Sequence, residues 1–459
     1  MEEQKERTHF IGIGGSGMSG LAKILLELGQ PVSGSDVQLT STTDKLQALG
    51  AKIYAGHSKE NIGPDVKLVV RSTAISPNNP EILRAQELHI PIIHRGELLA
   101  QLTERKKAIA VAGAHGKTTT TSMLACVLSR GGLDPTIVVG GELQDIGGNA
   151  KYGRGKYLIA EADESDGSFL KLHPHVAVVT NIEDDHLDHY GSVENIIKAF
   201  EKFINLVPED SFCVLCADDP ELDRMSRHRK NVFTYGLTGS PDYKAVDLIL
   251  EGAVSQAQIY FREQFLGTLE LTVPGQHNIS NALAAIAVAH QLGLNFQVMA
   301  EALKNFRGAG RRFQTVGNFN GIRIIDDYAH HPTEIRATLS AAKQLKPKRL
   351  WAVFQPHRYS RTRQLYKEFG KSFRDADQVI VNSIYAASEQ PIPGITAELI
   401  AEEIKKNGTA VQYMAAKEEI VQYLARECTP GDLVLTIGAG NIWTVGPELL
   451  AKLSGECGS

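Results

Sequence analysis

The sequence predicts an α/β protein of three domains, and three observations support this prediction. Apolar, β-branched runs alternate with helical patterns along most of the chain, which is typical of parallel sheets covered by helices. The length of 459 residues corresponds to about three domains at roughly 150 residues each. Two glycine-rich turns each lie between a predicted strand and a predicted helix, where backbone amides commonly face a bound anion.

The first hundred residues show the alternation clearly. Helical patterns cover residues 18–28 and 80–88. Short apolar runs predict strands at 9–13, 31–35, 53–55, 68–72 and 90–94. A polar, basic break at 103–107 precedes a new apolar run at 108–112, so we place a domain boundary near residue 104.

The rest of the chain repeats the pattern twice. In the second region a β-rich stretch at 230–273 and a long helix at 277–293 follow strands predicted at 136–139, 157–160 and 176–181. The basic, glycine-rich segment 306–312 is typical of a linker or hinge. Beyond it, strands are predicted at 322–325, 350–354, 378–381 and 433–437.

Composition excludes several classes of protein. Hydrophobic residues make up 42% and charged residues 22% of the chain, as in ordinary globular proteins. The formal net charge is −5, so the chain lacks the excess of positive charge that is typical of nucleic-acid-binding proteins, and we expect no nucleic-acid partner. No apolar stretch approaches the roughly 18 residues of a membrane span, so we expect no membrane insertion. The first nine residues lack the apolar core of a secretory signal, and five cysteines fit reduced thiols, so we expect a cytoplasmic location.

A glycine-rich turn lies near the amino terminus. Gly12, Gly14 and Gly17 follow the first predicted strand, and Asp36 ends the second strand 19 residues after Gly17. This spacing is typical of a turn that binds the pyrophosphate of a dinucleotide or a nucleotide sugar. A tight turn between strand and helix, with no ligand, is the alternative.

The second glycine-rich turn, GAHGKTTT at 113–120, has the composition of a phosphate loop. Its amides and Lys117 would hold β- and γ-phosphates, and the Thr118 hydroxyl would reach Mg²⁺. The loop departs from the usual spacing, because Val111 stands where the first glycine is expected. Threonines that only cap a helix start are the alternative.

Acidic side chains follow two further predicted strands of the second region. Glu161, Asp163 and Glu164 follow the strand at 157–160, and the segment TNIEDDHLDH at 180–189 follows the next strand. Carboxylate and imidazole groups without nearby cysteine suit Mg²⁺ or Mn²⁺ better than zinc. Solvated loops are the alternative.

By contrast, Cys213 and Cys216 lie in an apolar run without a second pair, which indicates buried structural thiols.

Two polar turns end strands of the third region. They are DDYAHHP at 326–332 and QPHRYSR at 355–361. Ligands of open α/β sheets gather at the carboxyl ends of strands, so we expect these histidines and arginines to meet an anion. A proline-started helix capped by histidine is the alternative for the first turn.

Five segments of the chain together resemble the Mur ligases, the three-domain, ATP-dependent amide ligases of peptidoglycan assembly. They are GAHGKTTTT, TNIEDDHLDHY, GQHNISNALAA, FRGAGRRF and DDYAHHPTEI, and the resemblance covers essentially the whole chain. It implies a Rossmann-like UDP-sugar-binding domain at 1–103, a central P-loop ATPase-type domain at 104–308 and a Rossmann-like amino-acid-binding domain at 309–459. Two more segments, HFIGIGGSGMSGLA and FQPHRYSRT, resemble the branch of the family that joins L-alanine to the lactyl carboxylate of UDP-N-acetylmuramate.

The resemblance also implies roles for single residues. The predicted UDP-sugar site comprises Gly12, Gly14, Gly15, Ser16, Gly17, Met18, Asp36, Ser72, Thr73, His94, Arg95 and Glu97. The predicted ATP site comprises Gly113, His115, Gly116, Lys117, Thr118, Thr119, Asn278, Asn281 and Arg311. Thr118, Glu161 and His186 are the expected Mg²⁺ ligands, with Mn²⁺ as a substitute. The residues expected at the reacting groups are Lys117, His186, His331, Arg358 and Arg361.

The implied partners are small molecules only: ATP, UDP-N-acetylmuramate and L-alanine. We expect a monomer or a weak homodimer. Two other functions fit parts of the sequence. A nicotinamide-dependent dehydrogenase would use the amino-terminal glycine turn with Asp36, but it leaves the GKT loop unexplained. A regulatory NTPase would sense the sugar nucleotide without acting on it.

Overall fold

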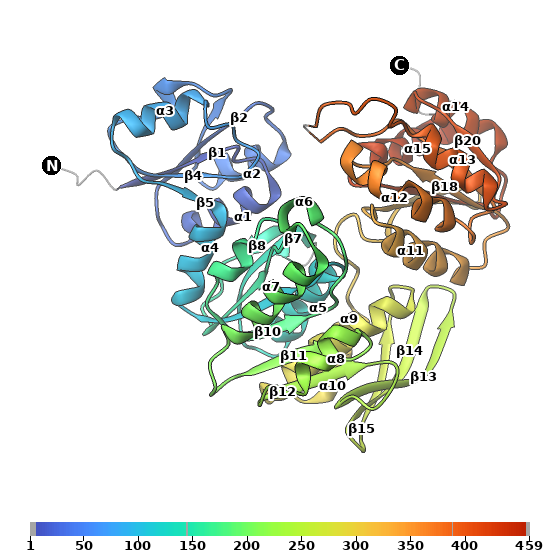
Figure 1. Cartoon of the computed structure of the whole chain (residues 1–459), viewed down its shortest axis with the longest axis horizontal. Helices are drawn as coiled ribbons and strands as arrows, with labels where there is room; N and C mark the ends of the chain where they lie inside the picture. The colour runs from blue at the N-terminus through green and yellow to red at the C-terminus, as the bar shows by residue number, and fades with distance from the viewer. Residues whose placement is uncertain (1–5, 144–145, 388, 456–459) are drawn as a thin grey trace. The chain divides into compact units, whose positions relative to one another are not determined.

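The computed structural model describes residues 6–143, 146–387 and 389–455, and within these ranges the chain forms three sheets of predominantly parallel strands (Figure 1). One sheet falls in each predicted domain, so the α/β class is confirmed; the boundaries near residues 104 and 308 stay predictions. The chain forms two compact units. The first unit comprises Met1–Val246, Gln258–Leu269 and Ser280–Lys304, and the second comprises Asp247–Ala257, Glu270–Ile279 and Asn305–Ser459.

The first sheet has five parallel strands in the order β3-β2-β1-β4-β5. Ile11 and Val69 on one face pack against Ile82 of helix α3 (Pro80–Glu87). The strands are β1 (Arg7–Ile11), β2 (Val32–Asp36), β3 (Lys52–Ala55), β4 (Val66–Arg71) and β5 (Ile92–His94). The helices are α1 (Ser16–Glu27), α2 (Ser41–Ala48), α3 (Pro80–Glu87) and α4 (Arg95–Glu104).

The second sheet has the order β15-β14-β13-β12-β11-β10-β6-β9-β7-β8. Strand β6 lies between β10 and β9, and residues 108–112 are fully buried, as the uninterrupted apolar run predicts. The strands are β6 (Lys107–Ala112), β7 (Thr136–Leu143), β8 (Gly148–Lys151), β9 (Tyr157–Glu161), β10 (Pro174–Val179), β11 (Phe212–Cys216), β12 (Val232–Gly236), β13 (Tyr243–Glu251), β14 (Val254–Phe261) and β15 (Gln264–Leu271). The helices are α5 (Lys117–Arg130), α6 (Leu187–Tyr190), α7 (Val193–Asn205), α8 (Pro220–Ser226), α9 (Gln276–Gln291) and α10 (Phe296–Lys304).

The third sheet has the order β16-β17-β21-β18-β19-β20, and its β16–β17 pair is antiparallel. Side chains of β18 alternate between the faces: Leu350 and Phe354 join one apolar core, whereas Trp351 joins the other. Helices therefore cover both faces of this sheet. The strands are β16 (Gln314–Phe319), β17 (Ile322–Asp327), β18 (Leu350–Phe354), β19 (Gln378–Val381), β20 (Val411–Tyr413) and β21 (Leu433–Ile437). The helices are α11 (Pro332–Gln344), α12 (Tyr359–Lys371), α13 (Glu398–Lys406), α14 (Lys417–Glu427) and α15 (Val445–Ser454).

The structure shifts or adds a few elements relative to the sequence prediction. Strand β1 ends at Ile11 rather than at residue 13, because the amides of Gly12 and Ile13 both donate to the carbonyl of Ser35 and the chain turns there. The predicted break at 103–107 is wrong in its extent, since α4 runs to Glu104 and β6 begins at Lys107. In the described residues, no helix is long and apolar enough to cross a bilayer.

Candidate active site

The phosphate loop connects the buried strand β6 to helix α5, as its sequence predicts. Gly113 has a φ of +136° and Gly116 has a φ of +81°, which side-chain-bearing residues rarely adopt. A Cβ at Gly113 would overlap the Thr180 hydroxyl, and one at Gly116 would lie 2.6 Å from Asn281 Oδ1. Both glycines are therefore required by conformation and by packing.

The end of strand β10 holds the loop in place. The His115 amide donates to Asn181 Oδ1 at 2.8 Å, and the Thr180 hydroxyl donates to the His115 carbonyl at 2.6 Å. From helix α9, Asn281 Oδ1 accepts a hydrogen bond from the Thr120 hydroxyl at 3.2 Å. The structure thus brings Asn281, a predicted ATP-site residue, to the loop.

Lys117 is the charged centre of the loop. Its ammonium donates to the Gly113 carbonyl at 2.6 Å and to Glu164 Oε1 at 2.7 Å. Burial by itself lowers the pKa of Lys117, but the Glu164 and Glu161 carboxylates outweigh burial and raise it. Burial raises the pKa of Glu164 to about 7, even though the neighbouring ammonium opposes the rise. Lys117 is therefore a charged, oriented donor beside the loop amides.

Thr118 and Glu161 form an oxygen-rich pair beside Lys117. The Thr118 hydroxyl lies 3.0 Å from Glu161 Oε2, which also accepts the Gly140 amide at 2.8 Å. His186, with a φ of +62°, places Nε2 3.7 Å from Glu164 Oε1. Carboxylate and hydroxyl oxygens with one imidazole fit Mg²⁺ or Mn²⁺. Thr119, the next residue of α5, is 8% exposed.

The amino-terminal glycine turn is organised by Asp36. The Gly14 amide donates to Asp36 Oδ2 at 2.9 Å, and a Cβ at Gly14 would lie 2.9 Å from the same oxygen. Gly12 has a φ of +77°. Asp36 thus fixes the turn, a contact that the predicted role in ligand binding did not include. The backbone from Gly15 to Gly17 opens α1, whereas the Met18 side chain is buried at 2% exposure.

The start of helix α4 approaches this turn and the end of strand β9. A Cβ at Gly17 would lie 3.0 Å from Arg95 Nη1, and Arg95 Nη2 donates to Asp163 Oδ2 at 2.5 Å. Burial alone would raise the pKa of Asp163, but Arg95 lowers it to about 2. The structure therefore brings Arg95 to the glycine turn.

Other predicted sugar-site residues lie at the ends of neighbouring strands. His94 ends β5 and caps α4, accepting the Gly96 amide at 3.2 Å, while Glu97 accepts the His94 amide at 3.2 Å. Burial lowers the pKa of His94. Ser72 and Thr73 directly follow β4, and the Thr73 side chain is exposed.

In the second unit, the turn after β18 presents two arginines. Arg358 has a φ of +72°, which strains a residue with a side chain, and its buried Nε has no hydrogen-bond partner among the described residues. Arg361 is 8% exposed, and its Nη1 donates to His357 Nδ1 at 3.3 Å. Burial, reinforced by His330 and both arginines, lowers the pKa of His357 to about 3, so this imidazole stays neutral.

Three further predicted residues of the second unit have clear positions. His331 is 4% exposed and precedes α11, and its amide donates to Glu334 at 3.3 Å. Arg311 donates to Asp326 at 2.9 Å and to the Gly438 carbonyl at 2.7 Å. Asn278 donates to the Pro274 carbonyl at 2.7 Å.

Several residues with evident roles were not among the predicted ones. Glu164 pairs with Lys117, and Asn181 holds His115. Glu389 accepts the Ser360 amide at 3.0 Å at the start of α12. Glu164 and Asn181 stand within the predicted acidic strand ends, so that pattern pointed to them; no local pattern marks Glu389. Cys213 and Cys216 are buried, which confirms their prediction, and burial raises the pKa of each to about 11.

A phosphate loop on a predominantly parallel sheet, with a further α/β sheet whose polar turn carries Arg358 and the buried Arg361, indicates a nucleotide-phosphate-binding α/β enzyme. Family models agree and are more specific. Residues 7–107 match the Mur ligase family catalytic domain, residues 111–289 the Mur ligase middle domain, and residues 311–440 the Mur ligase glutamate ligase domain. The chain belongs to the Mur ligase family, whose members catalyse ATP-dependent amide ligation in peptidoglycan synthesis.

Individual relatives are similar over their full length. The UDP-N-acetylmuramate–L-alanine ligase of Pelotomaculum thermopropionicum is 55% identical over 98% of both chains. That of Desulforamulus reducens is 53% identical over 99% of both chains. The crystal structure of the UDP-N-acetylmuramate-alanine ligase of Thermotoga maritima matches with a TM-score of 0.85 and 31% identity, over 98% of this chain and 99% of that one. The expectations of a Mur ligase fold and of a ligase are confirmed.

Proposed function

We propose that this chain joins L-alanine to the lactyl carboxylate of UDP-N-acetylmuramate and converts ATP to ADP and phosphate. The observation that carries the proposal is the phosphate loop, with Lys117 paired to Glu164 and the Thr118–Glu161 pair beside it. Full-length relatives named UDP-N-acetylmuramate–L-alanine ligase support the choice of substrates.

The first step must activate a carboxylate, which is a poor acyl donor because oxide would have to leave. The lactyl carboxylate attacks the γ-phosphorus of ATP, ADP leaves, and an acyl phosphate forms. Lys117 and the amides at 116–118 bind the phosphates and offset the repulsion between the two anions. Mg²⁺, or Mn²⁺ in its place, held by Thr118, Glu161 and His186, would add positive charge at the transferring phosphoryl group.

The second step forms the amide bond. The neutral amine of L-alanine attacks the acyl phosphate carbon, and phosphate leaves from the tetrahedral intermediate. Arg358 and Arg361 would bind carboxylate oxygens through paired N–H donors, and His331, which precedes α11 in the same unit, is expected at the reacting groups. The neutral His357 adds no charge that would compete for the carboxylate.

The amino-terminal glycine turn would bind the UDP-sugar. The open backbone of Gly12 to Gly17 at the start of α1 suits a pyrophosphate, and Arg95 adds a cation beside Gly17. A UDP-sugar and ATP as substrates indicate a cytoplasmic enzyme. The described cysteines, which form no disulfide, fit that location. A monomer or weak homodimer is expected, which light scattering after size exclusion would test.

The decisive experiment measures phosphate release from ATP with UDP-N-acetylmuramate, with and without L-alanine. We expect release to depend on both substrates, with the amide product detected by mass spectrometry. Glycine and L-serine in place of L-alanine would measure selectivity. Phosphate release that ignores L-alanine would contradict the proposal and favour a regulatory NTPase.

A further inference from the structure

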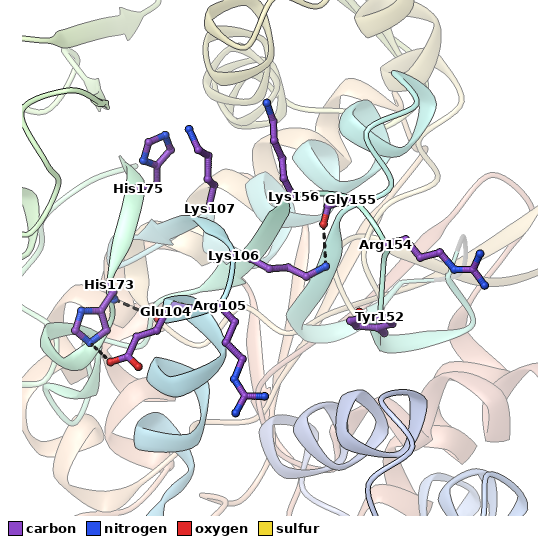
Figure 2. Close-up of a pocket in the computed structure, with 11 residues that line it drawn as sticks. Glu104, Arg105, Lys106, Lys107, Tyr152, Arg154, Gly155, Lys156, His173 and His175 are labelled. Atoms are coloured by element: carbon purple, nitrogen blue, oxygen red, sulfur yellow. Dashed lines mark hydrogen bonds and ion pairs between the residues drawn. The ribbon is translucent and has the colours of Figure 1, made fainter.

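A cavity of about 550 Å³ lies in the first unit at the amino-terminal ends of β6, β9 and β10. The phosphate loop follows the opposite, carboxyl-terminal end of β6, so the two features are at different edges of the sheet. The cavity is lined by residues from three short segments, 103–107, 152–156 and 173–175 (Figure 2). Its volume is within the range of small-molecule sites.

The lining is strongly cationic although the whole chain is acidic. It contains Arg105, Lys106, Lys107, Arg154 and Lys156, together with two histidines. Its one carboxylate belongs to Glu104, which lies 3.1 Å from Nε2 of His173. In the described part of the chain, none of the five lysine and arginine side chains forms an ion pair. Such a group of cations attracts a multiply charged anion.

The order of the strands brings two of these lysines and one histidine together. Strand β6 lies between β9 and β10, and neighbouring strands are about 4.8 Å apart. Lys107 begins β6, Lys156 directly precedes β9 and His175 is the second residue of β10, and in Figure 2 the three side chains extend in the same direction. Burial lowers the pKa of His175, Lys107 and Lys156 lower it further, and Asp210 opposes them. The two ammonium groups therefore lie close enough to His175 to disfavour its protonated form.

Packing fixes the rest of the cavity. Lys106 donates to the carbonyls of Gly153 and Gly155, at 2.5 and 2.8 Å, and its ammonium lies 4.7 Å from the centre of the Tyr152 ring. Any Cβ at Gly153 or Gly155 would overlap the carbonyls of residues 133–135. The turn that carries Arg154 is therefore anchored to the connector between α4 and β6. The backbone of the cavity is ordered before a ligand arrives, whereas the exposed side chains of Arg105, Lys107, Arg154 and Lys156 would be ordered by the ligand.

We propose that this cavity binds an oligophosphate anion, meaning inorganic pyrophosphate or tripolyphosphate or the phosphate chain of a nucleotide. Oligophosphates carry several negative charges within a few ångströms. This matches Lys107 and Lys156, whose side chains come from the amino-terminal ends of the neighbouring strands β6 and β9. A single carboxylate would leave most of these cations unneutralised.

The test titrates tripolyphosphate into the full chain by calorimetry, without divalent ions and at about 150 mM KCl, which screens weak surface attraction. Lys117→Ala is the background, and saturating UDP-N-acetylmuramate occupies the amino-terminal glycine turn, so that neither glycine-rich turn contributes. We expect one bound anion per chain. Lys107→Gln with Lys156→Gln should weaken binding at least about 10-fold, since each removes a charged hydrogen-bond donor.

The matched control removes the same charge elsewhere: Lys405→Gln with Lys406→Gln, both exposed on α13, should change binding less than about 2-fold. Titration of ATP and of adenosine in the same background distinguishes the sources. Binding of ATP that requires Lys107 and Lys156 indicates a nucleotide, and binding of tripolyphosphate alone indicates a free anion. No binding, equal weakening in both double variants, or binding only to anionic vesicles or duplex RNA would overturn the proposal.

Discussion

Replacement of Gly113 by alanine tests whether the phosphate loop depends on the backbone that the structure shows. At a φ of +136°, a side chain costs about 1–3 kcal/mol in strain. The added Cβ would overlap the Thr180 hydroxyl and lie 3.1 Å from the amide nitrogens of Thr180 and Asn181, and such overpacking typically costs about 1–3 kcal/mol. We therefore expect the free energy of unfolding of the first unit to fall by about 2–6 kcal/mol.

The loss of activity should be larger than the loss of stability suggests. The loop can relieve the overlap only by moving away from Thr180, which displaces Lys117 and the loop amides. A displacement of about 1 Å costs on the order of 100-fold in rate. The assay is kcat/KM for ATP from phosphate release, with the Kd for ADP by calorimetry and Tm measured on the same samples.

Gly132→Ala is the matched control. Gly132 follows α5 with a φ of +75°, and a Cβ there meets nothing within 4 Å. It should lower stability by about 1–2 kcal/mol and leave kcat/KM within about 2-fold. Thr180→Ala added to Gly113→Ala should lose less activity than the sum of the single losses, because the overlapped hydroxyl is gone. If Gly113→Ala alone keeps kcat/KM within about 3-fold, the assignment of the loop backbone to ATP is refuted.

Four further outcomes are expected. Lys117→Ala should lower kcat by at least about 100-fold without changing Tm by more than a few degrees, measured by phosphate release and thermal unfolding. Glu161→Gln should raise the Mg²⁺ concentration for half-maximal rate about 10-fold or more, and an unchanged metal titration would remove Glu161 from the metal site. Glu389→Ala should raise KM for L-alanine about 5-fold with KM for ATP unchanged, because the carboxylate that holds the Ser360 amide beside Arg358 is lost. Burial raises the pKa of Asp327 from 3.8 to about 6, so the folded protein binds this proton more tightly than the unfolded chain does. The free energy of unfolding of the wild type should therefore fall relative to that of Asp327→Asn as the pH rises from 4 to 8, by up to about 3 kcal/mol in urea unfolding. Equal pH dependence of unfolding in the two proteins would contradict that pKa shift.

Elements that depend on local sequence were predictable. Strands β19 and β21 begin and end at the predicted residues, because each is a short apolar run bounded by polar residues. Helix α4 was not predicted, since its start is capped by the His94 ring and by Glu97, and histidine is not among the preferred capping residues. Gly12, Gly113 and Gly116 were predictable because their positive φ values follow from a strand turning directly into a helix.

Contacts that depend on the order of the strands were not predictable. Lys107, Lys156 and His175 are far apart in the sequence, and only the neighbouring positions of β9, β6 and β10 bring them to one cavity. The formal net charge of −5 therefore did not predict the group of lysine and arginine side chains that lines this cavity. Likewise, the pairing of Ser360 with Glu389 joins residues 29 positions apart and follows no local pattern.

Internal carboxylates hold the groups that we assign to anionic substrates. Glu164 binds Lys117, Asp163 binds Arg95, and Glu389 accepts the Ser360 amide in the first turn of α12. Each cation or amide is therefore ordered before a substrate arrives, so less side-chain entropy is lost on binding. An incoming phosphate or carboxylate must exchange with an existing partner, so the gain is the difference between two charged interactions rather than the full strength of one. An anion with several charges displaces an existing carboxylate partner more readily than a single carboxylate does. This favours binding of ATP at Lys117 and of a UDP-sugar at Arg95. By contrast, the lysine and arginine side chains of the cavity at the other edge of the sheet form no ion pair among the described residues, and the one lining carboxylate, Glu104, lies against His173. A free oligophosphate would therefore displace no carboxylate from these lysines and arginines, which is the physical reason to expect it to bind there.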